Sequence, residues 1–225
     1  MQRDHYADHL LFFTRFPQAG AVKARLATDI GNANALAAHD AMTKYCLDAA
    51  DATAVTMGAS LHLLTTGASP ATAADWLGMR HRYIDQGDGD LGDRVARALR
   101  HSIARGARRI VVVGSDCPAL LAEDMVAGFQ LLTSHDVALG PATDGGFYLL
   151  GINANLAPRL SLMLADLPWG TDCARSVLER NAMRHGIRIG RLPLLSDVDR
   201  LTDIDPIRWP WLAAAAGLLP QAAGG

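Results

Sequence analysis

The feature that most constrains the fold is a run of four β-branched residues in mid-chain, Ile110-Val111-Val112-Val113. A strand that is apolar at every position is typical of a parallel sheet covered on both faces, because neither face of the strand can lie in water. The run ends in Gly114-Ser115-Asp116, so a carboxylate follows the strand almost at once. In open parallel sheets ligands bind beyond the carboxyl ends of the strands, and we therefore expect Asp116 at the functional site.

Other short apolar runs alternate with longer amphipathic stretches. This alternation predicts parallel βαβ units, and hence an α/β fold: one domain over residues 1–225, built as a three-layer sandwich with a mainly parallel sheet. The expected strands are His9–Thr14, Ser60–Thr66, Arg82–Asp85, Arg109–Gly114, Asp136–Gly140, Phe147–Ile152 and Ile187–Leu192. The expected helices are Ala33–Ala52, Thr72–Leu77, Leu91–Ala104, Glu123–Leu132, Cys173–Arg184 and Ile207–Ala216.

Charge and cysteine content narrow the class of protein. The net charge is −2, so no basic field indicates nucleic acid or a membrane surface as partner. The 3 cysteines are widely spaced and fit neither a disulfide framework nor a zinc site. The N-terminal segment MQRDHYADHLLFF lacks the apolar core of a secretory signal, and we expect a cytoplasmic protein. The C-terminal segment from Trp211 to Gly225 is expected to form a last helix and a frayed tail.

The first unusual loop spans residues 14–26 and follows the first predicted strand. It contains Gly20 and three cations, Arg15, Lys23 and Arg25. Free backbone N–H groups in such a loop can surround an anion, and the cations can neutralise phosphate oxygens. Composition alone favours an ordinary solvated turn, because glycine and proline punctuate any loop. The spacing matches neither a P-loop nor a dinucleotide-binding fingerprint. Our hypothesis for this loop is a nucleotide phosphate site.

The second unusual loop spans residues 86–94 and holds three glycines and three aspartates. Glycine lets the backbone approach a flat ligand closely, and we assign Leu91 and Gly92 to the nucleotide-binding surface. The amide of Gln86 suits the edge of a nucleobase, with a plain turn as an equal alternative. Asp90 is expected to cap the following helix.

Asp116, Asp197 and Asp199 are the candidate metal ligands. A carboxylate at the end of a central strand is poorly placed for packing and well placed for a hard cation that bridges phosphates. Asp197 and Asp199 occupy alternate positions of an extended segment, so their side chains are expected to share a face. Mg²⁺ is usually held by one or two carboxylates together with substrate phosphates, and Asp116 with either one would suffice. The neighbouring Asp203 and Asp205 are expected to belong to a polar loop.

The acceptor is predicted to bind at Asp144, Gly145, Gly146 and Trp169. Asp-Gly by itself is a strong hairpin signal, so an ordinary turn is the alternative for the first three residues. A Gly-Gly pair beside a carboxylate also lets a sugar or another acceptor lie close to the backbone. Trp169 is suited to stack on that acceptor, although buried packing is the commoner role of a tryptophan.

These loops include six motifs that occur in order along the chain. They are Phe13–Leu26, Gly89–Arg94, Gly114–Pro118, Gly140–Tyr148, Pro168-Trp169 and Asp197–Asp205. Together they resemble the bacterial DUF2064 family, whose members are often labelled radical-SAM/selenodomain-associated transferase 1 or glycosyltransferase A-like proteins. Each motif is weak alone, and six in register are specific.

The resemblance implies the fold of nucleotide-diphosphosugar transferases, the GT-A-like fold, which is also similar to 2-phospholactate guanylyltransferase. The Lys-Ser-Arg-Leu of the latter resembles Lys23-Ala24-Arg25-Leu26. The resemblance implies a nucleotide at the carboxyl ends of the strands, with Mg²⁺ or Mn²⁺ at Asp116. Ala24 replaces the threonine usual in the family, so one hydroxyl contact to phosphate is absent.

Taken together, the sequence predicts a metal-dependent transferase that uses a nucleotide-activated donor, with Lys23, Asp116 and Asp144 as catalytic residues. Glycosyl transfer from a nucleotide sugar is the first hypothesis. Nucleotidyl transfer from a nucleoside triphosphate to a phosphorylated acceptor is the second. A third is a non-catalytic nucleotide-binding module, since such folds host many functions. The retained acidic residues favour an enzyme over this third hypothesis.

Overall fold

The computed structural model describes residues 7–219, in which one seven-stranded sheet has the order β3-β2-β1-β4-β6-β5-β7. All neighbouring strands are parallel except β6, which is antiparallel to both β4 and β5. The mainly parallel α/β sheet predicted from the alternation of elements is therefore confirmed. The strands are β1 Asp8–Arg15, β2 Ser60–Thr66, β3 Arg82–Asp85, β4 Arg109–Val113, β5 Val137–Pro141, β6 Phe147–Asn153 and β7 Ile189–Arg191.

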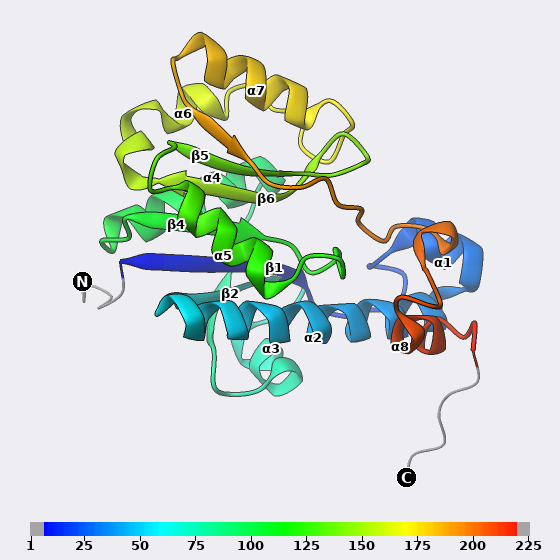
Figure 1. Ribbon diagram of the computed structural model, residues 1–225. Coiled ribbons are helices and arrows are strands. Elements are labelled where there is room, and N and C mark those ends of the chain that lie inside the picture. Colours follow the sequence, from blue (N-terminus) through cyan, green and yellow to red (C-terminus); the bar gives the residue numbers. More distant parts are fainter. Residues whose placement is uncertain (1–6, 220–225) are drawn as a thin grey trace.

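Helices cover both faces of the sheet (Figure 1). On one face α2 (Asn32–Met57) and α5 (Ala122–Leu131) pack over Val111 and Val113 of β4. On the other face α4 (Leu91–Ala104) and α7 (Ala174–Arg184) pack with Ile110 and Val112. Successive side chains of a strand point to opposite faces, so a strand with a core on each side needs an apolar residue at every position. This explains the β-branched run.

The shorter helices lie at the ends of these layers. They are α1 Ala24–Ile30, α3 Pro70–Leu77, the 3₁₀ segment η1 Ala154–Arg159, α6 Leu160–Met163, the 3₁₀ segment η2 Leu201–Asp203 and α8 Pro210–Ala215. Several element boundaries differ from expectation, among them the end of α2, which extends to Met57 instead of Ala52. Two further differences concern the shorter helices. The first loop ends in a helix at Ala24, since α1 turns Leu26 into the core, where it is fully buried. The last helix begins at Pro210, whose fixed φ suits a first helical position.

The segment after β7 crosses the carboxyl ends of the central strands. Leu195 forms a β-bridge with Ala142, and the Val198 amide donates to the Asp116 carbonyl oxygen at 2.9 Å. The Val198 side chain is fully buried, so this late segment is anchored beside the loop that follows β4. Within residues 7–219 no helix combines the length and apolarity needed to cross a membrane. The predictions for the N-terminal residues 1–6 and for the tail 220–225 lie outside the described residues.

Candidate functional site

A cavity of about 860 Å³ opens at the carboxyl ends of β1 and β4. Its walls come from the end of β1, the start of α1, the N-terminal turn of α4, the β5–β6 turn, residues 169–171 and the segment 197–199. The topological expectation that Asp116 lies at such a cavity is therefore met. Sequence-distant segments converge here because parallel strands present their carboxyl ends at one edge of the sheet.

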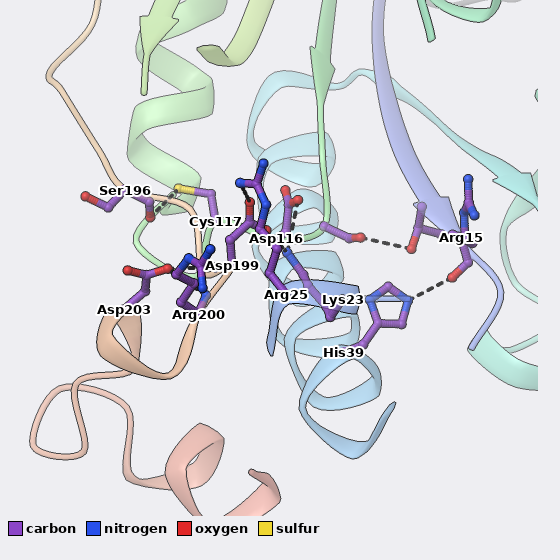
Figure 2. A network of polar contacts seen from close by, with 12 residues as sticks. Arg15, Lys23, Arg25, His39, Asp116, Cys117, Ser196, Asp199, Arg200 and Asp203 are labelled. Carbon is purple, nitrogen blue, oxygen red and sulfur yellow. Dashed lines mark hydrogen bonds and ion pairs between the residues drawn. The ribbon is translucent and has the colours of Figure 1, made fainter. Parts of the chain in front are cut away.

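Lys23 is the centre of the polar network shown in Figure 2. Its Nζ atom lies 3.3 Å from Asp116 Oδ2 and 3.1 Å from Asp199 Oδ1. Only 8% of the Lys23 side chain is exposed, whereas 44% of each carboxylate side chain is exposed. One buried ammonium therefore joins two carboxylates that still face solvent.

The backbone of Lys23 is held in a conformation that non-glycine residues seldom adopt. Its φ is 48° and its ψ is 50°, at the position immediately before α1. Left-handed backbone costs an ordinary residue about 1 kcal/mol or more. Such strain persists when surrounding contacts over-determine it, and it gathers at functional sites. The two ion pairs of Lys23 are contacts of that kind.

The charges at this network shift each other's protonation equilibria. Burial disfavours the Lys23 ammonium, but Asp116 and Asp199 together outweigh burial and raise its pKa. The Lys23 charge holds the pKa of Asp116 below its usual range, against the effect of burial. Both groups are therefore charged at neutral pH.

Asp197 lines the same cavity, and its protonation state differs from that of Asp116. Burial raises its pKa to about 8, and the charges of Asp116 and Asp144 contribute in the same direction. Its Oδ1 atom is buried without a hydrogen-bond partner. A carboxyl in such surroundings is mostly protonated at neutral pH while no cation is bound. A cation beside it would favour the ionised form, so Asp197 stays a candidate ligand together with Asp199. Asp199 is the one that shares the Lys23 ammonium with Asp116.

The resemblance implies a divalent cation at Asp116, and the donor atoms around this residue decide whether one fits. Within residues 7–219 no three acidic, histidine or cysteine side chains are grouped closely enough to hold a metal by themselves. Asp116 and Asp199 do converge on one cationic atom, Lys23 Nζ. Two carboxylates completed by substrate phosphates are a usual Mg²⁺ arrangement. The donor set fits a cation that binds together with a phosphorylated ligand.

The other residues of the first loop are spread along one side of the cavity. Arg15 and Arg25 line it, and Arg25 Nη1 lies 3.5 Å from Asp199 Oδ2. Gly20 lies outside the cavity, in an exposed turn with a φ of 77°. The prediction that Gly20 contacts a nucleotide is therefore not supported by its position. A glycine is needed at position 20 because the turn requires this positive φ.

Gln86 also differs from expectation. Its side chain is buried, and Nε2 donates to the carbonyl oxygens of Thr14 and Leu64, both at 2.9 Å. Both amide hydrogens are thus used to join β1 and β2, and they are not available to a nucleobase. A sequence pattern cannot reveal this, because the two acceptors are 72 and 22 residues away.

The rest of the second loop is partly as predicted. Asp90 caps α4: its Oδ1 atom accepts from the Asp93 amide at 2.9 Å, which confirms the capping role. Leu91 lines the cavity. Gly92 is needed for a different reason from the one expected, since a Cβ atom there would overlap the Trp169 indole. Gly92 permits α4 to touch Trp169.

Three of the four predicted acceptor residues line the cavity. Asp144, Gly146 and Trp169 line it, and the Trp169 ring makes an edge contact with Phe147 at a centroid distance of 5.5 Å. Gly145 does not itself line the cavity, and a Cβ atom there would overlap the Asp172 carbonyl. Close backbone packing therefore explains the glycine, and its contact with the acceptor stays a prediction.

His39 is a cavity residue that the sequence reasoning missed. It is 5% exposed, and its Nε2 atom lies 2.9 Å from the Arg15 carbonyl oxygen, to which the ring N–H donates. Burial lowers its pKa, so the ring is neutral and holds the backbone of the first loop. A histidine in the middle of a helical pattern gives no sign of such a contact. Asp203 and Asp205 have the structural roles expected of a polar loop, as acceptors for nearby amides.

The raised pKa of Asp197 predicts a pH dependence of stability in protein freed of divalent cations. The folded state keeps a proton that the unfolded state releases near pH 4, so stability falls as pH rises from about 4 to 8. The slope is at most about 1.4 kcal/mol per pH unit. Asp197→Asn should remove most of this slope, measured by urea unfolding at several pH values. An unchanged slope would show that Asp197 is ionised in the folded protein.

The close packing of Gly145 predicts a large loss of stability in Gly145→Ala. The added Cβ meets main-chain atoms of Asp172, which cannot move aside as a flexible side chain would, and the φ of 90° adds strain. We expect a loss of about 3 kcal/mol, measured by thermal unfolding. Gly20→Ala is the matched control, because its φ is also positive and a Cβ there meets no atom within 4 Å. Equal losses in the two variants would contradict the packing argument.

Comparison with known proteins identifies the class of fold. The structure resembles a candidate nucleotide-diphospho-sugar transferase from Desulfovibrio desulfuricans G20, with a TM-score of 0.82 and 27% identity over 90% of this chain and 86% of that chain. It also resembles a CMP:2-keto-3-deoxy-manno-octonic acid synthetase solved with CTP, with a TM-score of 0.56 and 14% identity over 94% and 99% of the two chains. The inositol-1-phosphate CTP transferase of T. maritima gives a TM-score of 0.56 and 10% identity over 95% and 97%. The last two show the shared fold alone.

The family follows from the sequence itself. Residues 49–171 match the family model described as "Uncharacterized protein conserved in bacteria (DUF2064)", and the chain belongs to this family. The resemblance inferred from the six motifs is therefore confirmed. No curated protein matches the chain. The fold is that of nucleotide-sugar and nucleotidyl transferases, as expected.

Proposed function

We propose that this protein is a metal-dependent glycosyltransferase that uses a nucleotide sugar as donor. The observation that carries the proposal is the ammonium of Lys23 held between Asp116 and Asp199 at a large cavity beyond the carboxyl ends of the strands. Two carboxylates and a buried lysine at one point can bind both a cation and the phosphates that accompany it. The similarity to a candidate nucleotide-diphospho-sugar transferase supports the same donor class.

Each side chain has a place in the proposed reaction. Lys23, with Arg15 and Arg25, binds the diphosphate and offsets the charge that develops on it as it leaves. Asp116 and Asp199 would hold Mg²⁺ or Mn²⁺, which when bound supplies further positive charge to the phosphates. Catalysis then depends on positioning and electrostatics, without a covalent nucleophile.

The acceptor side has one carboxylate, Asp144. The acceptor oxygen forms a bond to the anomeric carbon while the bond from that carbon to the diphosphate oxygen breaks. The nucleoside diphosphate departs with the bonding electrons, and Asp144 takes the proton of the acceptor hydroxyl. Asp144 Oδ1 accepts from the Gly146 amide at 2.8 Å, which orients the carboxylate at the cavity wall.

Thermal-shift measurements test this proposal. Nucleotide sugars and free nucleoside triphosphates should be compared with and without Mg²⁺ or Mn²⁺. A ligand at about 100 times its Kd adds roughly 2.7 kcal/mol of stability, which is readily detected. We expect the larger metal-dependent shift with a nucleotide sugar, followed by release of nucleoside diphosphate. A larger shift with a triphosphate, with release of pyrophosphate, would favour nucleotidyl transfer. No shift with either would favour a protein without this activity.

A further inference from the structure

The charged residues of the cavity are unevenly distributed. Arg15, Lys23 and Arg25 belong to the first loop and lie on the donor side with Asp116. A further cation, Arg94 of α4, lines the cavity beside Gln86 and donates from Nε to the Gly89 carbonyl oxygen at 2.9 Å. The opposite wall, which we call the acceptor wall, has no lysine, arginine or histidine among its described lining residues. The acceptor wall consists of Asp144, Phe147, Tyr148, Trp169, Thr171 and Ala174.

The acceptor wall carries one carboxylate, Asp144, and no cation among its own described residues. Asp144 is exposed, and its Oδ2 atom receives no hydrogen bond from the residues that the structure describes. A nearby cation, Arg175, donates from Nη1 to the Ala142 carbonyl oxygen at 3.4 Å and does not line the cavity. A phosphate placed here would meet a carboxylate without a counter-charge, which is unfavourable.

The acceptor wall also presents a fixed aromatic surface. Trp169 is pressed against Gly92 on one side and makes an edge contact with Phe147 on the other. A tryptophan held in this way offers a flat apolar surface without the entropy cost of ordering it on binding. Tyr148 contributes little to this surface, because it is 5% exposed and its hydroxyl donates to the Pro193 carbonyl oxygen at 2.8 Å. A ligand with a planar or apolar face fits such a wall.

We propose that the acceptor is an uncharged, hydroxyl-bearing molecule with a planar or apolar face, such as a glycoside, and that the acceptor wall discriminates against phosphorylated acceptors. This inference rests on the proposed function, because it names the second substrate of the same site. Its hydroxyl lies against Asp144 and its apolar face against Trp169. The discrimination comes from like-charge repulsion at Asp144 together with the absence of a cation.

Binding of matched probes tests the inference without requiring turnover. The probes are p-nitrophenyl glycosides and their 6-phosphates, titrated calorimetrically into the protein. We expect each neutral glycoside to bind at least about tenfold more tightly than its phosphate. Equal or tighter binding of the phosphates would overturn the inference, and so would the absence of binding by every neutral glycoside.

A charge reversal sharpens the test. Asp144→Lys should strengthen binding of the 6-phosphates by about tenfold or more and leave little preference for the neutral probes. Asp88→Lys is the matched control, because Asp88 is exposed and does not line the cavity. An unchanged preference in Asp144→Lys, or the same change in Asp88→Lys, would contradict the role of Asp144.

The two proposals fail in different ways. The donor proposal fails if no nucleotide gives a metal-dependent thermal shift, whatever the probes do. The acceptor inference fails if the probes show the wrong preference while the nucleotide shift is intact.

Discussion

Replacing Asp116 with asparagine is expected to lower metal-dependent turnover by at least about 100-fold. The variant keeps the size of the side chain and removes one of the two carboxylates that converge on Lys23. With Asp199 alone, a divalent ion would have one charged protein ligand, and the Lys23 ammonium would lose half of its counter-charge. The measurement is release of nucleoside diphosphate from the donor identified by thermal shift, with Mg²⁺ or Mn²⁺ at saturating concentration.

The fold should survive this substitution. The hydrogen bond from Val198 to residue 116 involves the main-chain carbonyl, so asparagine leaves it in place. Asp88→Asn provides the control, since it removes one negative charge from an exposed position outside the cavity. Full activity of Asp116→Asn in a correctly folded protein would sink the assignment of the site.

Lys23→Met is expected to lower turnover by a similar factor and also to destabilise the protein. The substitution keeps an unbranched side chain in the buried space and leaves Asp116 and Asp199 facing each other without the ammonium. Breaking a fully buried ion pair costs 3–5 kcal/mol. We expect about 2 kcal/mol here, because each carboxylate side chain is 44% exposed and partly screened by water. Urea unfolding measures the loss.

The pH dependence of this stabilisation follows from the two pKa directions. The Lys23 contribution is present below the ordinary lysine pKa and is lost as pH rises through the raised folded value. The Asp116 contribution is present above the ordinary aspartate pKa and is lost as pH falls through the depressed folded value. Both charges are present at neutral pH, but Lys23 also lowers the pKa of Asp197, so the difference between wild type and Lys23→Met should grow as pH rises through the folded Asp197 pKa of about 8.

Metal binding separates the two roles assigned to Lys23. In Lys23→Met the ammonium no longer competes for Asp116 and Asp199, so Mn²⁺ without nucleotide should bind more tightly than in wild type, while turnover falls. Calorimetric titration with Mn²⁺ detects this directly. Weaker Mn²⁺ binding in the variant would show that these carboxylates are not the metal ligands.

The fold could be predicted largely from patterns local to the chain. The strands β2 and β3 and the helix α4 have the predicted boundaries, because apolar runs and a capping aspartate mark them. The short helix α1 was missed, since its apolar pattern is brief and only the burial of Leu26 shows that it packs. The sequence pattern after β7 did not predict the path of this segment, which depends on the hydrogen bond from the Val198 amide to the Asp116 carbonyl oxygen.

The site could be predicted only in part, because many of its contacts join residues that are far apart in the chain. The sequence by itself determined that Asp116 follows a doubly buried strand, that Arg15 stands at the end of β1 with Lys23 and Arg25 after it, and that Asp90 caps a helix, because each depends on near neighbours. Only the tertiary structure decided that Lys23 joins Asp116 to Asp199 across 93 and 176 residues, that Gln86 is used internally, and that Gly92 and Gly145 serve packing. These contacts depend on which distant segments meet at one edge of the sheet, and residue spacing along a chain does not contain that information.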